Sequence, residues 1–126
     1  MKVIIAGSRD FDNYKMLNAY CSLILKGCKK ADIEIISGGA KGADSLAEKF
    51  ALEHNLIFKK FPANWETEGK QAGTKRNREM INYVRDSKAL LIAFWDGTSP
   101  GTKNMITISI NAGISVSVIN YNNLSA

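Results

Sequence analysis

The stretch Ser37-Gly38-Gly39-Ala40-Lys41-Gly42-Ala43-Asp44 decides the fold of this chain. A short apolar run, residues 33–36, precedes it, and a helical pattern that begins at Ala43 follows it. A strand, a glycine-rich turn and a helix in this order point the first free N–H groups of the helix out of the end of a sheet. Unpaired amides and the helix dipole both favour negative charge, so this turn is a candidate site for a phosphate or another anion.

Strand and helix patterns alternate on both sides of this turn. Predicted strands cover residues 3–6, 33–36, 56–58, 89–94 and 114–119, and predicted helices cover residues 13–26, 43–54, 73–86 and 101–112. Elements that alternate in this way indicate an α/β fold, in which helices cover both faces of a mostly parallel five-stranded sheet. The length of 126 residues fits a single three-layer domain that spans residues 1–126.

Composition narrows the class of protein. Hydrophobic residues make up 45% of the chain and charged residues 23%, which is typical of a soluble globular protein. No apolar run is long enough to cross a membrane and the first residues lack a signal pattern, so we expect a cytoplasmic location and no membrane partner. Cys21 and Cys28 are expected to be core residues on one face of a helix, too far apart for a disulfide. With His54 as the single histidine, no metal site is expected.

The loops after residues 6, 36, 58 and 94 are expected to share one rim of the sheet, because ligands of parallel sheets bind at the carboxyl ends of the strands. Gly7, Ser8 and Arg9 follow the first strand. Gly7 lets a ligand approach the backbone, Ser8 offers a hydroxyl, and Arg9 offers a planar guanidinium suited to phosphate. The alternative for this group is ordinary turn chemistry.

The glycine-rich turn is neither of the two common nucleotide motifs. It lacks the Lys-Ser/Thr pair of a P-loop and does not follow the pattern G-x-G-x-x-G. Its backbone amides remain able to form an anion-binding nest. The candidate residues of that nest are Ser37, Gly38, Gly39, Ala40 and Gly42. Asp44, in the first helical turn, either stabilises the helix N-terminus or hydrogen-bonds a ribose hydroxyl.

A second group of candidates lies at residues 72–80. Asn77 precedes Met80 and Ile81 at helical spacing, so it faces the apolar interior, where an amide is costly unless it is paired. Either a ligand or a loop carbonyl can satisfy it. Arg76 is one position away and can reach the same cleft.

The loop that follows the predicted strand at residues 89–94 supplies the remaining candidates. Gly101 and Thr102 sit at another strand-to-helix junction, a second potential anion site. Trp65 and Trp95 both fall in predicted rim loops, where each either stacks on a base or caps the edge of the core.

Five motifs in order, residues 7–11, 37–44, 61–65, 72–80 and 101–102, resemble the YspA/YpsA-related branch of the SLOG superfamily, which is named after the Smf/DprA and LONELY GUY proteins. The resemblance covers nearly the whole chain. It implies a Rossmann-like fold, for which we expect the strand order 3-2-1-4-5, and a site for a nucleotide or nucleotide derivative. Relatives include cytokinin-activating phosphoribohydrolases, a DNA-processing protein and domains that sense ADP-ribose-like signals.

The resemblance also bears on enzymatic activity. The hydrolase relatives carry a P-G-G-x-G-T-x-x-E motif, whereas the matching stretch here, residues 100–105, lacks a glycine pair and has Met105 at the glutamate position. A methionine cannot transfer a proton, so that hydrolysis is not expected to run through this position. Asp44 and Asp96 are the other carboxylates that a hydrolytic reaction would have available.

Three functions follow from these residues. The first is binding of a nucleotide such as an ADP-ribose or NAD-related compound, as a sensor or a sequestering module. The second is hydrolysis of an N-glycosidic or phosphate bond in such a nucleotide. The third is binding of single-stranded nucleic acid, which is suggested by the basic excess within residues 59–88 and by Trp65. The last strand and the outer helix faces also allow a homo-oligomer, and no cofactor beyond the nucleotide is implied.

Overall fold

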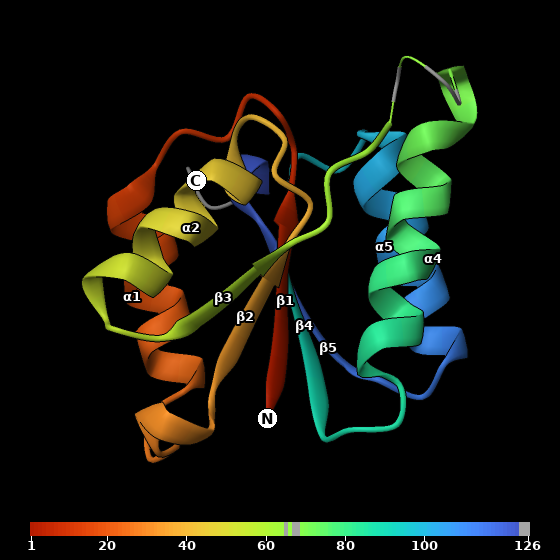
Figure 1. Ribbon diagram of the computed structural model, residues 1–126. Helices are drawn as coiled ribbons and strands as arrows, with labels where there is room; N and C mark the ends of the chain where they lie inside the picture. The colour runs from red at the N-terminus through yellow and green to blue at the C-terminus, as the bar shows by residue number, and fades with distance from the viewer. Residues whose placement is uncertain (65, 67–68, 124–126) are drawn as a thin grey trace.

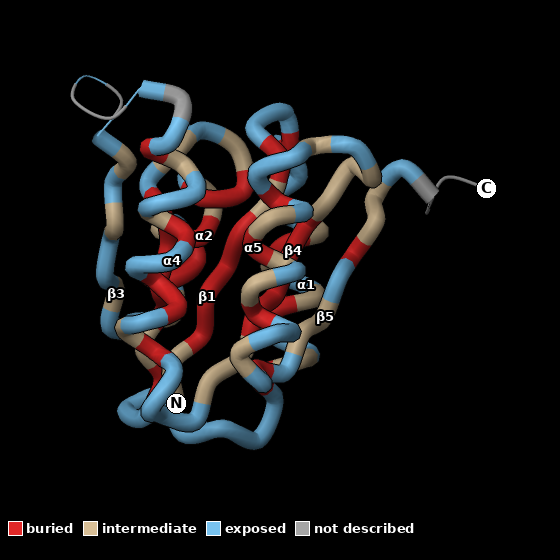
Figure 2. The backbone as a smooth tube through the Cα atoms, turned by 90° about the vertical axis from the view of Figure 1, so that its right-hand side faces the viewer, coloured by how far each residue is buried: buried red, intermediate tan, exposed pale blue. Residues whose placement is uncertain are grey.

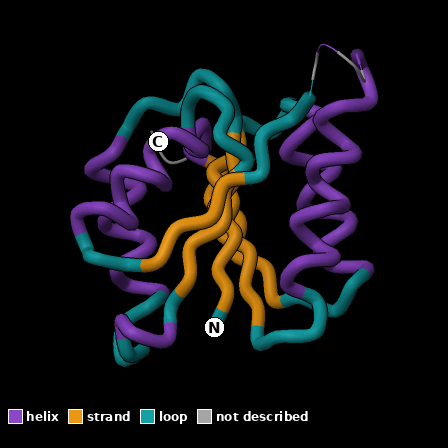
Figure 3. The backbone as a smooth tube through the Cα atoms, viewed as in Figure 1, coloured by secondary structure: helices purple, strands orange, loops and turns teal. Residues whose placement is uncertain are grey.

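The computed structural model, which describes residues 1–64, 66 and 69–123, contains one sheet of parallel strands (Figures 1 and 3). The order along the sheet is β3-β2-β1-β4-β5, which confirms the predicted fold class and the predicted strand order. Every neighbouring pair of strands is parallel. The strands are β1 (Lys2–Gly7), β2 (Glu34–Ser37), β3 (Ile57–Lys60), β4 (Ala89–Trp95) and β5 (Ser115–Asn120).

Helices cover the sheet on both faces. Helices α1 (Tyr14–Ile24) and α2 (Ala43–Glu53) pack on one face, and α4 (Ala72–Val84) and α5 (Pro100–Asn111) pack on the other (Figure 1). Short 3-10 helices lie at Lys30–Asp32 (η1), Gly69–Gln71 (η2) and Tyr121–Asn123 (η3). Each predicted strand and helix is present, with its ends shifted by at most two residues. None of the helices in the described part of the chain is long and apolar enough to span a membrane.

The core is divided by the sheet into two clusters. Successive side chains of a strand point to opposite faces, so Val3 and Ile5 join the cluster under α1 and α2, whereas Ile4 joins the cluster under α4 and α5. Figure 2 shows β1 and β4 as the buried centre of the molecule. Strands buried on both faces have continuous apolar sequences, which is why residues 89–94 lack alternation.

The prediction that both cysteines belong to the core is wrong for Cys28. Cys21 is buried, but Cys28 is exposed. Helix α1 ends at Ile24, and Gly27 then adopts a φ of 87°, which turns the chain before Cys28 can return to the helix face. At the other end of α1, Asn13 caps the helix, because its Oδ1 accepts a hydrogen bond from the Met16 amide at 3.0 Å.

Candidate functional site

A cavity of about 580 Å³ lies at the carboxyl ends of β1 and β4. Its lining residues come from the loop after β1 (within 6–10), from the first half of α4 (within 73–80), and from the loop after β4 with the start of α5 (within 96–105). Ala40 and Asp44 close it on the side of α2. This is the edge at which parallel α/β sheets hold their ligands.

The cavity brings together many of the residues singled out in the sequence. The predicted site residues that line it are Gly7, Ser8, Arg9, Ala40, Asp44, Arg76, Asn77, Asp96, Gly101 and Thr102. The described residues that line it do not include Ser37, Gly38, Gly39, Gly42 or Trp95. Trp65 lies outside the described residues.

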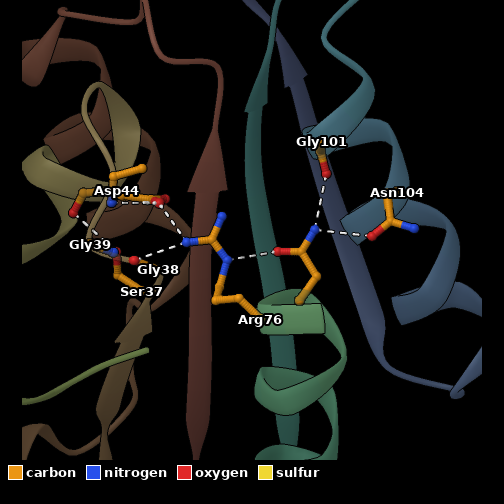
Figure 4. A network of polar contacts seen from close by, with 9 residues as sticks. Ser37, Gly38, Gly39, Asp44, Arg76, Gly101 and Asn104 are labelled. Atoms are coloured by element: carbon orange, nitrogen blue, oxygen red, sulfur yellow. Dashed lines mark hydrogen bonds and ion pairs between the residues drawn. The ribbon is translucent and has the colours of Figure 1, made fainter. Parts of the chain in front are cut away.

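Arg76 crosses the top of the sheet from α4 to the loop before α2 (Figure 4). Its Nη1 donates to the Gly38 carbonyl oxygen at 2.9 Å and lies 3.8 Å from Asp44 Oδ2. Its Nε donates to Asn77 Oδ1 at 3.1 Å. These contacts with described residues use Nη1 and Nε and do not involve Nη2.

Asn77 continues the same network to α5, where Gly101 and Asn104 lie (Figure 4). Its Nδ2 donates to the Gly101 carbonyl oxygen at 3.2 Å and to Asn104 Oδ1 at 3.0 Å. The side chain is on the inward face of α4, as predicted, and the residue is only 4% exposed. The prediction offered a ligand or a loop carbonyl as the partner of this buried amide, whereas the structure pairs it with a carbonyl in the first turn of α5 and with the Asn104 side chain.

The glycine-rich turn is closed largely by its own contacts. The Gly39 amide donates to Ser37 Oγ at 3.3 Å, and the Ala40 amide donates to Asp44 Oδ2 at 3.2 Å. Ser37 Oγ donates to the Asp44 carbonyl oxygen at 3.1 Å. Two amides of the predicted nest thus point at protein atoms, and the turn contributes to the cavity through Ala40 and Asp44.

The charged groups of the cavity influence one another. Burial raises the pKa of Asp44, while Arg76, the Ala40 amide and Arg9 act in the opposite direction. Burial lowers the pKa of Arg76, the Asp44 charge raises it, and the Arg9 charge lowers it. Arg9 is thus close enough to act on both groups. Two guanidinium groups beside one carboxylate favour an anionic guest.

Asp96 anchors the loop after β4. Its Oδ1 accepts hydrogen bonds from the amides of Thr98 at 2.9 Å and Ser99 at 2.7 Å, and its Oδ2 accepts one from Ser99 Oγ at 2.7 Å. The backbone amides of Ser99 and Thr98 lower the pKa of Asp96 to about 2. A carboxyl with that pKa holds no proton near neutral pH, so it is unsuited to general acid catalysis.

Two other predicted site residues, Trp95 and Gly7, have structural roles near the cavity. Trp95 Nε1 donates to the Ser99 carbonyl oxygen at 3.1 Å, which places the indole in its own loop. At Gly7 a Cβ atom would lie 2.5 Å from the Phe94 carbonyl oxygen and 2.6 Å from the Ala43 Cβ. The close packing of β1, β4 and α2 therefore requires a glycine at this position, whether or not a ligand binds.

The N-terminus of α5 opens on the cavity. Pro100 occupies its first turn, and Gly101 and Thr102 line the cavity beside it. Thr102 is 6% exposed, and its hydroxyl makes no hydrogen bond to any described residue.

Sequence reasoning missed Thr74 and Ser99, which also line the cavity. Their position at the first turn of α4 and just before α5 is the signal that marks them, because such residues sit at the same edge as the carboxyl ends of the strands.

Comparison with known proteins gives two findings. The family model described as "YspA, cpYpsA-related SLOG family" matches residues 1–67. The Gene 61 protein of Mycobacterium phage D29 is 36% identical over 87 residues, which cover 65% of this chain and 67% of the phage protein. The family match includes the loop after β1 and the glycine-rich turn, whereas α4 and α5 lie beyond it.

Proposed function

The chain belongs to the YspA, cpYpsA-related SLOG family, as its motifs predicted, and from that premise we propose that its cavity binds a nucleotide or a nucleotide-derived ligand. Membership of the family is consistent with nucleotide-related ligands in general. ADP-ribose and NAD-related compounds are the first candidates, and sensing or sequestration of such a compound is the proposed role.

The observation that carries the proposal is that Arg9, Arg76 and the first turn of α5 share one cavity. Guanidinium groups bind phosphate through parallel N–H bonds, and the free amides of a helix N-terminus favour an anion. The volume of about 580 Å³ falls in the range of roughly 300–1,000 Å³ that is usual for small-molecule sites.

The proposed roles differ from those that the glycine-rich turn alone would give. A phosphate group is placed between Arg9, Arg76 Nη2 and the amides of Gly101 and Thr102, with the Thr102 hydroxyl as a further donor. The glycine-rich turn acts one step away, because the Gly38 carbonyl and Asp44 hold Arg76 in position.

Calorimetric titration and thermal shift with ADP-ribose, NAD, AMP and inorganic phosphate test the proposal. At least one nucleotide is expected to raise the melting temperature and to bind measurably at millimolar concentration or below. Arg9→Ala and Thr102→Val are each expected to weaken binding about tenfold or more, which is about 1.4 kcal/mol. Arg78→Ala is the matched control, because Arg78 lies in a separate groove between α4 and α5. Absence of binding by every nucleotide, or equal loss in the control, would overturn the proposal.

A further inference from the structure

We propose that Tyr121 and Asn122, in η3 directly after β5, are positioning residues that hold the two outer loops of the cavity. One loop, residues 8–11, follows β1, and the other, residues 96–99, precedes α5. The consequence for ligand affinity rests on the proposed function, whereas the effect on the loops is measurable without any ligand.

Tyr121 holds the loop after β1 by two contacts. Its hydroxyl donates to Asp10 Oδ1 at 2.8 Å. Its ring packs on Phe11, with 4.9 Å between ring centroids and an interplanar angle of 49°. Phe11 in turn stacks on Phe94 of β4, again with 4.9 Å between centroids. Because Asp10 lines the cavity and Phe11 anchors in the core, Tyr121 fixes both the polar and the apolar side of this loop.

Asn122 holds the loop before α5. Its Nδ2 donates to the Asp96 carbonyl oxygen at 2.9 Å, and its backbone amide donates to Asn120 Oδ1 at 3.2 Å. The Asp96 carboxylate organises the turn that leads into Ser99 and α5. A shift of Asp96 would therefore move the N-terminus of α5, where the proposed phosphate site lies.

The two loops also meet each other, since the Asp96 amide donates to Ser8 Oγ at 3.2 Å. Loops hold a binding geometry less accurately than strands unless a surrounding shell supports them. Here η3 contacts both loops through Tyr121 and Asn122. Neither residue is among the described residues that line the cavity. They act through Asp10 and Asp96, which do line it.

Amide hydrogen exchange of the ligand-free protein is the first test. Tyr121→Phe keeps the ring and removes the hydroxyl, so faster exchange is expected at Phe11, whose amide donates to the Ser8 carbonyl oxygen at 3.1 Å. Asn122→Ala is expected to speed exchange at Asp96, Thr98 and Ser99. Tyr20→Phe on α1 is the control and should leave both loops unchanged. Unchanged exchange in both η3 variants, with or without a change in melting temperature, overturns the proposal.

Ligand affinity is the second test, with ADP-ribose as the probe. Each η3 variant is expected to bind about fivefold more weakly than wild type, which is about 1 kcal/mol. Rescue of Asn122→Ala by Asn122→Gln is not expected, because the longer side chain displaces the amide from the Asp96 carbonyl. If wild type binds and both variants bind equally well, the positioning role is overturned. If wild type binds no nucleotide, the proposed function fails, and the exchange results still decide whether η3 holds the loops.

Discussion

Asn77 shows how much of the site depends on one side chain. Its oxygen holds the Arg76 guanidinium, and its nitrogen holds the Gly101 carbonyl, so a single amide joins α4 to the start of α5. Helical periodicity predicts that Asn77 faces inward. It does not predict the partners, because Asn104 and Gly101 come from an element more than twenty residues further along the chain. Which donor meets which acceptor is decided only when α4 and α5 pack side by side.

Asn77→Leu is expected to lower the free energy of unfolding by about 2–3 kcal/mol, because it leaves Arg76 Nε and the Gly101 carbonyl without their partner in a buried place. Urea denaturation measures the change. Asn82→Leu, at an exposed position of the same helix, should stay within about 0.5 kcal/mol of wild type. Equal effects of the two substitutions would show that the Asn77 network does not stabilise the fold.

Cys21 gives the protein a specific weakness in alkali. Burial raises the pKa of this thiol from 9.0 to about 12, so the folded state keeps a proton that the unfolded state releases. The free energy of unfolding must then fall as pH rises above 9. Tyr14 and Tyr121, whose pKa values rise from 10.0 to about 12, add to this decline over the same interval and more strongly above pH 10. The contribution of Cys21 is therefore isolated by comparing the wild type with a variant that lacks this thiol.

Cys21→Ala is expected to flatten the decline in unfolding free energy between pH 9 and 10 by about 1 kcal/mol per pH unit. Denaturant titrations at several pH values give the slope. Cys28→Ala, which removes the exposed thiol, serves as the control and should keep the wild-type slope. A wild-type slope in Cys21→Ala would mean that this thiol is not the group that titrates.

At the scale of elements, the glycine-rich turn differs most from its expectation. The order of strand, turn and helix is as the sequence predicts, but the Gly39 and Ala40 amides face Ser37 and Asp44. That choice depends on the rotamer of Asp44 and on Arg76, which arrives from α4. The end of β3 could not be predicted from the sequence either. Lys59 and Lys60 belong to β3 because their backbones pair with Ile36 and Ser37, although their side chains are exposed.

Gly42 is the point at which this turn touches the loop after β1. Its φ is 78° and ψ is −132°, and a Cβ atom there would lie 2.3 Å from the Ser8 carbonyl oxygen. Gly42→Ala is expected to cost about 3 kcal/mol or more of stability, from backbone strain and from the clash together. Gly27 has a similar φ of 87°, but a Cβ atom there would have no other atom within 4 Å. Gly27→Ala should therefore cost only about 1 kcal/mol of stability. Thermal and urea unfolding compare the two, and equal costs would contradict the close approach of the loops.

On the scale of the whole molecule, the sheet separates two apolar clusters that share only its strands. The topology could be predicted because alternating elements with right-handed crossovers leave few arrangements. The same reasoning places the loops after β1, β2 and β4 at one edge. It does not say which residues of those loops reach the cavity, since Trp95 turns back on Ser99 while Thr74 faces the space.

Ile35→Val and Ile81→Val test the separation of the clusters, because Ile35 lies under α1 and α2 and Ile81 under α4 and α5. Each is expected to cost about 0.5–1.5 kcal/mol, and the double variant should equal the sum within about 0.5 kcal/mol. Urea unfolding followed by tryptophan fluorescence and by circular dichroism should give one shared transition. A larger coupling energy would mean that the two clusters interact directly. Two separate transitions would mean that they unfold independently. Either result would contradict two clusters that unfold together and share only the strands of the sheet.

The chain starts at the amino end of β1, at the opposite end of the sheet from the carboxyl ends of the strands (Figure 1). There the Met1 amine donates to the Asp32 carbonyl oxygen. Residues placed ahead of Met1 convert that amine into an amide, which still donates. A fluorophore, an affinity tag or a tether to a surface attached there therefore leaves the cavity facing solution. The same attachment after η3 would load the segment that contacts the two outer loops, so immobilisation through the amino terminus is the orientation that leaves those loops undisturbed.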